Sequence, residues 1–316
     1  MGLFIPSDGV NVSTEKSPMD GVFLVMKGHE NKLSSHAYHF FGGNGVPLHM
    51  AVANGFPPHT YEPMLSTFLH KYQAFSALPR ALWEPPPALD SAPDWHTAGD
   101  DLLAGLHRLG HSGVIGVGHS MGGVATMLAA VKEPSLFRGI VMLDPVILPP
   151  FALWAVAITR PFGFSFVPLS KKALKRRRHF NALDEAFAYW RKKRLFEDWS
   201  DDVLQKYTSG LLVEDAENDG YRLQWEPEWE AHYYDSVPTN TWRYLRKLPK
   251  DLPALIIRGE KSDTLFPSAV KRIQRLVPHV EIVTIEGYGH LFPQAAPEQT
   301  ADLVRNWMTK HGWNRT

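Results

Sequence analysis

The sequence predicts an α/β fold with a mostly parallel central sheet, flanked by helices and interrupted by one inserted helical segment. Short apolar runs alternate with helical patterns in the first half of the chain, and the alternation returns near its end. Between these parts, residues 146–238 contain helical patterns and no clear strand. We therefore expect a core made of residues 1–145 and 239–316 and a helical insertion at 146–238. The length of 316 residues suits one such unit with an insertion.

The core is predicted to begin with strands. Apolar runs at 22–26 and 37–41, separated by polar residues, predict an antiparallel pair. The glycine-rich residues 42–45 form a strong turn signal. A third strand is expected at 47–53, and it ends at the turn-rich residues 54–58.

Strands and helices then alternate. Strands are expected at 72–77, 113–118, 140–143, 252–258 and 280–285, and helices at 61–71, 95–109, 121–131, 267–276 and 297–311. Within the insertion, helical stretches are expected at 181–196 and 201–212. Strands joined by helical crossovers pair in parallel, so these elements predict one continuous sheet.

Composition and charge exclude several classes of protein. The chain is 44% hydrophobic and 21% charged, which is typical of a folded globular protein. Its 33 basic residues balance its 33 acidic residues, so no net charge attracts nucleic acid. It contains no cysteine, which excludes disulfides, thiolate catalysis and cysteine metal sites. With no secretory signal pattern in the first twenty residues, we expect a cytoplasmic protein.

The strongest chemical signal is Gly-His-Ser-Met-Gly at residues 118–122. This G-x-S-x-G pattern follows an apolar strand and opens a helix, as a nucleophile elbow requires. The flanking glycines leave room for the tight turn that exposes Ser120. The pattern alone is weakly specific, and a glycine-rich turn with an idle serine is the alternative interpretation.

A nucleophilic serine needs a base and an acid that orients it. His290 follows the apolar strand that ends at Ile285, which places it at the same edge of the sheet as Ser120. Asp263 lies just beyond the strand at 252–258, and the order Ser120, Asp263, His290 is that of serine hydrolases with this elbow. We favour Asp263 as the acid. Asp144, at the end of another strand, is the alternative.

An oxyanion hole needs two backbone N–H donors. One is expected from Met121, directly after the nucleophile. The other is expected from Phe56 in the loop after the third strand, because Pro57 has no N–H and Gly55 allows a close backbone approach. A simple turn is the alternative interpretation of this loop.

This constellation resembles the α/β-hydrolase superfamily, and within it the serine hydrolases with a helical cap, or lid, domain. The resemblance extends over roughly residues 22–311 and is carried by the elbow at 118–122, the acid loop at 258–263 and the histidine loop at 287–290. It implies an α/β-hydrolase fold, with residues 146–238 as the cap. A serine at the elbow argues against the superfamily's epoxide hydrolases and haloalkane dehalogenases, which use aspartate there.

The resemblance further implies an enzyme that cleaves a carboxylic ester or related acyl bond through a Ser-His-Asp triad. Residues 146–168 are apolar and aromatic, with Arg160 as their only charge. We favour the interpretation that they line an apolar pocket, which implies a largely apolar small-molecule substrate; the alternative is that they pack the cap on the sheet. The alternatives are a carbon–carbon bond, thioester or lactone hydrolase on the same triad, or a ligand-binding homologue that turns over slowly. We see no H-E-x-x-H motif, phosphate loop or dinucleotide fingerprint, so we expect neither a metal nor an organic cofactor.

A basic cluster follows this apolar stretch, with six Lys or Arg among residues 171–178. A charge run is usually a solvated helix face, and we favour that interpretation. Contact with an anionic membrane surface through residues 146–178 is the alternative. A membrane span is not expected, because Pro149, Pro150 and Pro161 interrupt the stretch.

Overall fold

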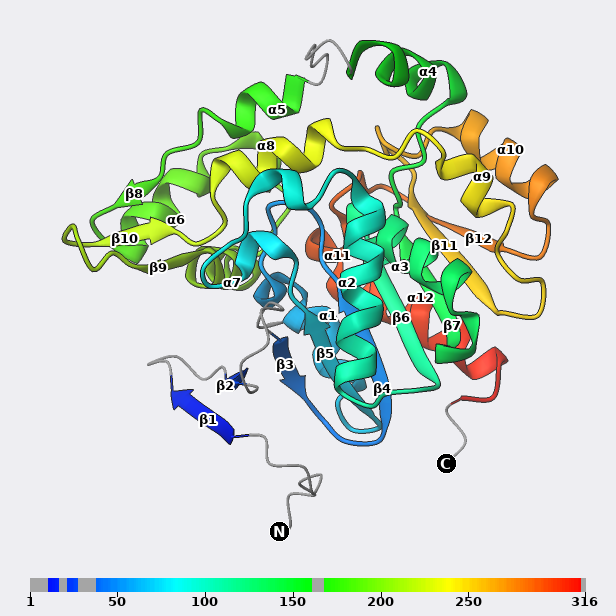
Figure 1. Cartoon of the computed structure of the whole chain (residues 1–316), viewed down its shortest axis with the longest axis horizontal. Helices are drawn as coiled ribbons and strands as arrows, with labels where there is room; N and C mark the ends of the chain where they lie inside the picture. The colour runs from blue at the N-terminus through cyan, green and yellow to red at the C-terminus, as the bar shows by residue number, and fades with distance from the viewer. Residues whose placement is uncertain (1–10, 17–21, 28–37, 161–167, 314–316) are drawn as a thin grey trace.

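The computed structural model describes residues 11–16, 22–27, 38–160 and 168–313. A nine-stranded sheet runs through the core in the order β1-β2-β3-β5-β4-β6-β7-β11-β12 (Figure 1). Its strands are β1 (Asn11–Lys16), β2 (Val22–Lys27), β3 (Tyr38–Gly42), β4 (Val46–Ala51), β5 (Tyr72–Ala77), β6 (Val114–His119), β7 (Phe137–Leu143), β11 (Ala254–Gly259) and β12 (Glu281–Ile285).

The sheet is antiparallel at one edge and parallel through its centre. Strands β1, β2, β3 and β5 pair antiparallel in succession, and every pairing from β5 to β12 is parallel. In the register of the central strands, Ala51 lies opposite Gly118 and His119 opposite Leu143. The loops that follow β4, β6 and β7 therefore leave the sheet side by side. This register brings distant parts of the sequence to one edge.

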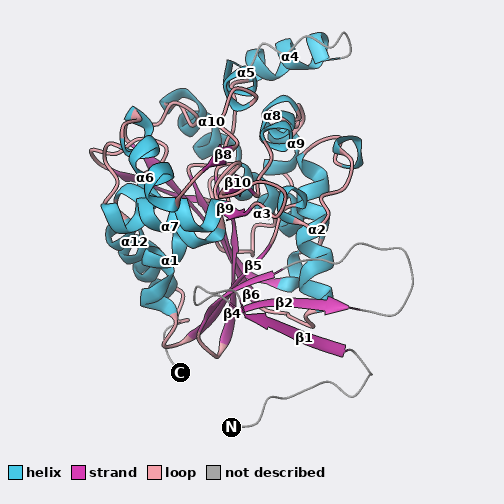
Figure 2. Ribbon diagram, turned by 90° about the vertical axis from the view of Figure 1, so that its left-hand side faces the viewer, coloured by secondary structure: helices cyan, strands magenta, loops and turns pink. Residues whose placement is uncertain are grey.

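Helices cover both faces of the sheet (Figure 2). α2 and α3 lie on one face, and α1 and α12 on the other. The core helices are α1 (Glu62–Leu65), α2 (Trp95–Arg108), α3 (Met121–Lys132), α10 (Pro267–Leu276), α11 (Phe292–Ala295) and α12 (Pro297–Lys310). The central strands β6 and β7 are almost entirely buried between these layers. The predicted fold class, a mostly parallel sheet flanked by helices, is confirmed.

The helix expected at 61–71 is broken into short pieces. Only α1 is α-helical, with 3₁₀ turns before and after it. The Ser66 and Thr67 hydroxyls donate to the carbonyls of Pro63 and Met64 in the preceding turn. Such side-chain bonds compete with the backbone bonds of a regular helix. The strand expected at 37–41 is observed as β3, although residue 37 lies outside the described residues.

Residues 146–238, which we call the inserted segment, connect β7 to its neighbour β11. The helices here are α4 (Pro150–Thr159), α5 (Pro168–Ala173), α6 (Leu183–Arg191), α7 (Asp201–Leu211) and α8 (Pro227–Asp235); α9 (Thr241–Leu245) follows. The expectation of a segment without strands is wrong. β8 (His179–Phe180), β9 (Leu212–Glu214) and β10 (Tyr221–Leu223) form a small antiparallel sheet in the order β8-β10-β9. Strands of two or three residues are too short to show an alternating pattern.

Within the described residues, the structure contains no helix that is both long enough and apolar enough to cross a bilayer.

Candidate active site

Ser120 occupies the sharp turn between β6 and α3. Its φ of 57° and ψ of −117° lie in a region that L-residues rarely adopt. The glycines on either side are required by close packing. A Cβ on Gly118 would lie 2.3 Å from the Gly122 carbonyl oxygen, and one on Gly122 would lie 2.2 Å from the Ala51 carbonyl oxygen. The predicted elbow geometry is therefore present.

The His290 imidazole lies between a hydroxyl and a carboxylate. Its Nε2 is 3.0 Å from Ser120 Oγ, and its Nδ1 is 2.7 Å from Asp144 Oδ2. Because a carboxylate can only accept, Nδ1–H donates to Asp144 and Nε2 is free to accept from the serine hydroxyl. These distances are those of a nucleophile, a base and an orienting acid. The structure thus brings together the predicted pair Ser120 and His290.

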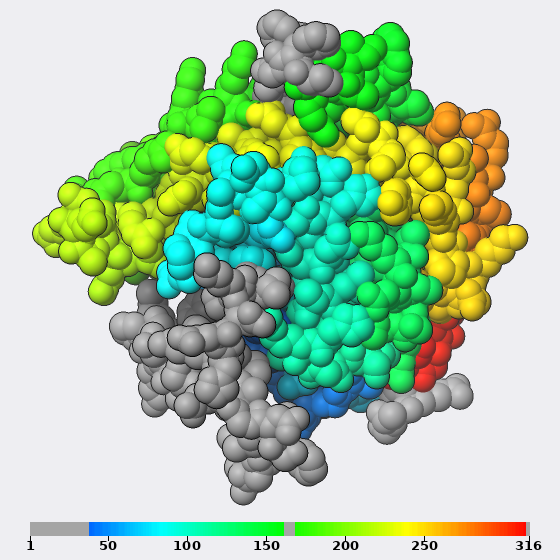
Figure 3. All heavy atoms as spheres, in the orientation of Figure 1, coloured from blue at the N-terminus to red at the C-terminus, as the bar shows by residue number. Residues whose placement is uncertain are grey.

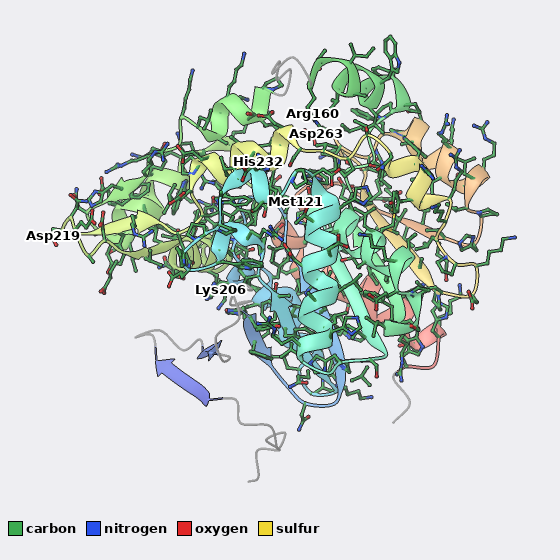
Figure 4. The ribbon with its side chains drawn as sticks, viewed as in Figure 1. Met121, Arg160, Lys206, Asp219, His232 and Asp263 are labelled. Carbon is green, nitrogen blue, oxygen red and sulfur yellow. The ribbon has the colours of Figure 1, made fainter. Side chains whose placement is uncertain are left out.

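The acid in contact with His290 is Asp144 and not Asp263, which we favoured from the sequence. Asp263 is exposed, although Figure 4 shows it at the same end of the core as Met121. Asp144 directly follows β7, the immediate neighbour of β6, and its side chain is fully buried. Adjacent strands place their terminal residues closest together. The end of β7, with Asp144, is therefore nearer to Ser120 at the end of β6 than the end of β11 is.

Three donors besides His290 surround the Asp144 carboxylate. The Gly259 N–H donates to Oδ1 over 3.0 Å, and the Ser262 and Thr264 hydroxyls donate to Oδ2 over 2.5 and 2.7 Å. Burial raises the pKa of Asp144, but the hydrogen bonds from His290, Ser262 and Thr264 outweigh that effect and hold the pKa below its ordinary value. The acid loop that we singled out therefore contacts Asp144 through a backbone N–H and two hydroxyls.

His119, beside the nucleophile, belongs to a second network that sequence reasoning missed. Its Nε2 lies 3.0 Å from the His290 carbonyl oxygen, and its Nδ1 lies 2.9 Å from the Tyr61 hydroxyl. That hydroxyl accepts the Ala53 N–H over 3.0 Å. Burial, followed by the nearby His290, lowers the pKa of His119 to about 3, so the ring is neutral. When the neutral ring carries its proton on Nε2, every donor in this series of hydrogen bonds has an acceptor. The series links the His290 loop to the loop after β4.

The two predicted oxyanion donors differ in their present partners. Met121 is the first residue of α3, where backbone N–H groups lack an intrahelical acceptor. The Phe56 N–H makes a 3.2 Å bond to the Ala53 carbonyl, which closes the turn at 53–56. A bound oxyanion would have to share or replace that long bond. The role of Phe56 remains a prediction.

The inserted segment contacts this loop through a buried ion pair. Arg176 binds the Glu230 carboxylate and also donates to the Tyr207 hydroxyl over 2.8 Å. The Asn54 side-chain amide donates to the Glu230 carbonyl over 2.9 Å, and a Cβ on Gly55 would lie 3.0 Å from the Glu230 carboxyl carbon. Asn54 and Gly55 thus fit the α8 helix closely.

Aromatic rings of the inserted segment pack on Phe56. Its ring centroid lies 5.8 Å from that of Tyr207 and 6.0 Å from that of Trp199. Phe196 completes the cluster, with centroids 4.9 Å from Trp199 and 5.0 Å from Tyr207. The Phe56 side of the predicted oxyanion loop is therefore lined by aromatic rings.

Among the described residues, one group of side chains has the spacing of metal ligands. His39, His59 and Glu62 place ligand atoms within 4.8 Å of one another. The ammonium group of Lys206 already lies 2.8 Å from the Glu62 carboxylate. An ion pair therefore accounts for the acidic member of this group.

Known proteins match this chain over most of its length. It is 24% identical over 213 residues to the mouse (Mus musculus) sn-1-specific diacylglycerol lipase ABHD11, a match that covers 66% of this chain and 63% of the lipase. It is 25% identical over 223 residues to 2-(acetamidomethylene)succinate hydrolase of Mesorhizobium japonicum, covering 66% of this chain and 69% of that enzyme. The chain thus spans slightly less than two thirds of the lipase.

Solved structures show the same fold. The crystal structure of E-2-(acetamidomethylene)succinate hydrolase gives a TM-score of 0.70 at 18% identity and covers 95% of this chain and 100% of that one. The peroxisomal alpha-beta-hydrolase Lpx1 of Saccharomyces cerevisiae gives 0.65 at 15% identity and covers 98% and 90%. Residues 41–303 match the sequence model of the alpha/beta hydrolase family. With that match over most of its length, the chain belongs to the alpha/beta hydrolase family, and its relatives are hydrolases.

Proposed function

We propose that the protein is a serine hydrolase that cleaves a carboxylic ester or a related acyl bond through Ser120, His290 and Asp144. One observation supports this most strongly. The His290 ring contacts Ser120 Oγ and Asp144 Oδ2 at the same time, at 3.0 and 2.7 Å. A histidine with only a structural role does not need a strained serine beside it. A nucleophile elbow does place a strained serine within reach of a histidine.

The proposed reaction begins when Ser120 Oγ attacks the substrate carbonyl and His290 Nε2 takes its proton. The imidazolium that forms is stabilised by the Asp144 carboxylate. The amides of Met121 and Phe56 donate to the oxyanion. As the intermediate collapses, His290 gives the proton to the leaving group, and the acyl group stays on Ser120. Water, deprotonated by His290, then releases the acid.

The substrate we propose is largely apolar. The aromatic cluster of Phe56, Phe196, Trp199 and Tyr207 supports this, because it lies against the predicted oxyanion loop. The inserted segment, through this cluster and through Glu230, would act as a cap over Ser120. A relative named as a diacylglycerol lipase fits an apolar acyl substrate, whereas the compound in the name of the other, 2-(acetamidomethylene)succinate hydrolase, is more polar.

Two measurements test the proposal. A fluorophosphonate probe should label the protein, and labelling should disappear in Ser120→Ala. A chain-length series of p-nitrophenyl esters, run beside thioesters and lactones, should show which acyl bond is cleaved and should favour apolar acyl groups. A ligand-binding homologue with slow turnover would show neither labelling nor ester cleavage.

Ser120→Ala should lower kcat by about 10⁴–10⁶-fold with little change in the fold, since it removes the nucleophile. Ser66→Ala is the matched control, because Ser66 is an exposed serine whose hydroxyl contacts only a local carbonyl among the described residues. Ester hydrolysis by Ser120→Ala at the rate of the control would refute the role of Ser120.

A further inference from the structure

Exposed apolar side chains gather on two neighbouring helices of the inserted segment. Of the seven large hydrophobic residues that are exposed in the described chain, five lie on α4, on α5 or directly after α5. We call these five the apolar platform: Phe151, Trp154, Ile158, Leu169 and Leu174. Phe151 and Trp154 expose 75% and 69% of their surface. Such a concentration on one part of a surface indicates a binding role.

The platform has the geometry of a helix that lies flat on a surface. Phe151, Trp154 and Ile158 are spaced by three and four residues, so they form a stripe along one side of α4. The opposite side is fixed to the body of the protein. Leu153 is buried there, and Arg160, which follows the helix, donates to the Val237 carbonyl.

Lysine residues accompany the apolar side chains. Lys171, Lys172 and Lys175 are exposed and alternate along the chain with Leu169 and Leu174. None of the three lysines pairs with an acidic residue in the part of the chain that the structure describes. The neighbouring arginines are neutralised, since Arg176, Arg177 and Arg178 pair with Glu230, Glu185 and Glu228. The three lysines beside the platform therefore carry positive charge that no acidic side chain of the described residues neutralises.

α4 and α5 lie together at one outer end of the molecule. Figures 1 and 2 both place them there, beyond α8. In Figure 3, the green segment that carries them forms part of the upper rim of the surface. α5 is held to α8 by a 2.7 Å hydrogen bond from Ser170 to Asp235. The platform is thus on the side of the protein where the carboxyl ends of the parallel strands meet the inserted segment.

We propose that the apolar platform docks the protein on an anionic membrane surface. Aromatic and aliphatic side chains on α4 and α5 enter the boundary between headgroups and acyl chains, and the three lysines meet the anionic headgroups. α4 has ten residues, about 15 Å of helix, so it lies on the bilayer and does not span it.

Charge favours a membrane over a second copy of the chain. A two-fold dimer would place the same patch on both partners, which brings unpaired lysines against lysines. An anionic lipid surface offers the complementary charge. This inference does not rest on the proposed hydrolysis, because docking requires no turnover.

Vesicle co-flotation tests the inference. The full chain should float with vesicles that contain phosphatidylcholine and phosphatidylglycerol, and much less with phosphatidylcholine alone. Phe151→Ser combined with Trp154→Ser should weaken binding at least about tenfold, because two large apolar side chains no longer enter the interface. Replacing Lys171, Lys172 and Lys175 by Gln should remove most of the preference for anionic vesicles.

Leu195→Ser is the matched control, since Leu195 is 60% exposed but lies outside the platform. It should bind as the unchanged protein does. Hydrolysis of a small soluble ester without vesicles, or circular dichroism where no ester is cleaved, verifies that each variant is folded. The proposal is overturned if the unchanged protein does not float with anionic vesicles, or if the double variant binds as well as the control. A dimer that the double variant abolishes, without vesicle binding, would assign the platform to a second copy.

Discussion

The Asp144 carboxylate is fully buried, yet its surroundings keep it ionised. Burial raises its pKa, but donors from His290, Ser262 and Thr264 outweigh that effect and leave the pKa low. An ionised Asp144 holds the Nδ1–H tautomer of His290, which leaves Nε2 free to accept the serine proton. The ionised state of Asp144 thus determines which nitrogen of His290 carries the proton.

Asp144→Asn should lower kcat by about 10⁴-fold, because an amide no longer holds His290 in the productive tautomer. Asp263→Asn serves as the control, and its kcat should remain close to that of the unchanged protein because Asp263 is exposed. Steady-state hydrolysis of one ester by both variants checks this. The reverse order of losses would restore Asp263 as the acid.

The sequence predicts the observed contact between Ser120 and His290, but it favours Asp263 as the carboxylate beside His290, where the structure has Asp144. The elbow motif and the strand before His290 identify those two residues, since both signals are local. Asp144 and Asp263 each follow a predicted strand, and only the sheet order separates them. β7 lies between β6 and β11, so Asp144 is nearer to Ser120. Sheet order depends on long-range pairing, which local patterns do not contain.

At the level of elements, the loop after β4 is fixed by α8. Asn54 donates to the Glu230 backbone, and the Glu230 side chain lies against Gly55. Glu230 in turn pairs with Arg176, whose side chain is 17% exposed against 11% for Glu230. A close fit at this contact determines where the predicted oxyanion donor Phe56 lies.

Arg176→Met should destabilise the fold by about 3–5 kcal/mol, because it leaves the Glu230 carboxylate buried without its partner. The double change Arg176→Met with Glu230→Gln should recover part of that loss, since no unpaired charge remains. Urea unfolding monitored by circular dichroism measures both.

Arg178→Met provides the matched control, because the Arg178–Glu228 pair is 53% and 41% exposed and contributes little. Its effect should be about 1 kcal/mol or less. Equal losses for Arg176→Met and Arg178→Met would contradict a buried, structurally important pair.

The inserted segment shows where element prediction fails. α7 begins at Asp201 and ends at Leu211, close to the expected helix at 201–212, because Ser200 caps it and its apolar residues have helical spacing. β8, β9 and β10 were missed because each is stabilised by its neighbours rather than by its own pattern. The hairpin between β9 and β10 depends on Gly220, whose φ is +108°.

For the whole molecule, three buried histidines link folding to pH. His39, His49 and His119 are each less than 5% exposed. Burial, with a nearby histidine as the smaller cause, lowers the pKa of each to about 3. In the unfolded chain the same rings titrate near 6.5. The unfolded state therefore binds more protons than the folded state between these values.

Stability should be fully present above about pH 6.5 and should fall as the pH drops toward 3, by about 1.4 kcal/mol per pH unit for each histidine. Asp144 acts in the same direction at lower pH, because its folded pKa is depressed and its stabilisation is lost on acidification. Urea unfolding at a series of pH values measures the slope.

His49→Gln removes one ring that takes up a proton on unfolding, so it should reduce that slope by about 1.4 kcal/mol per pH unit. The fold should persist, because the Gln side-chain oxygen can accept the hydrogen bond that the Ala77 N–H now donates to His49. A slope that His49→Gln leaves unchanged would show that this buried histidine does not control acid unfolding.

Ser120 and Asp144 are the two non-glycine residues in the described chain with positive φ, at 57° and 40°. Such conformations cost about 1–3 kcal/mol each, so the fold must tolerate local strain at both residues that contact the His290 ring. Ser120 follows β6 and Asp144 follows β7, and these two strands are buried and paired with each other. Attack on an acyl carbon would then begin from a hydroxyl that is already aimed, with little reorganisation left for the reacting state. At these two positions, the backbone conformation that suits the proposed reaction is therefore less stable than an ordinary one.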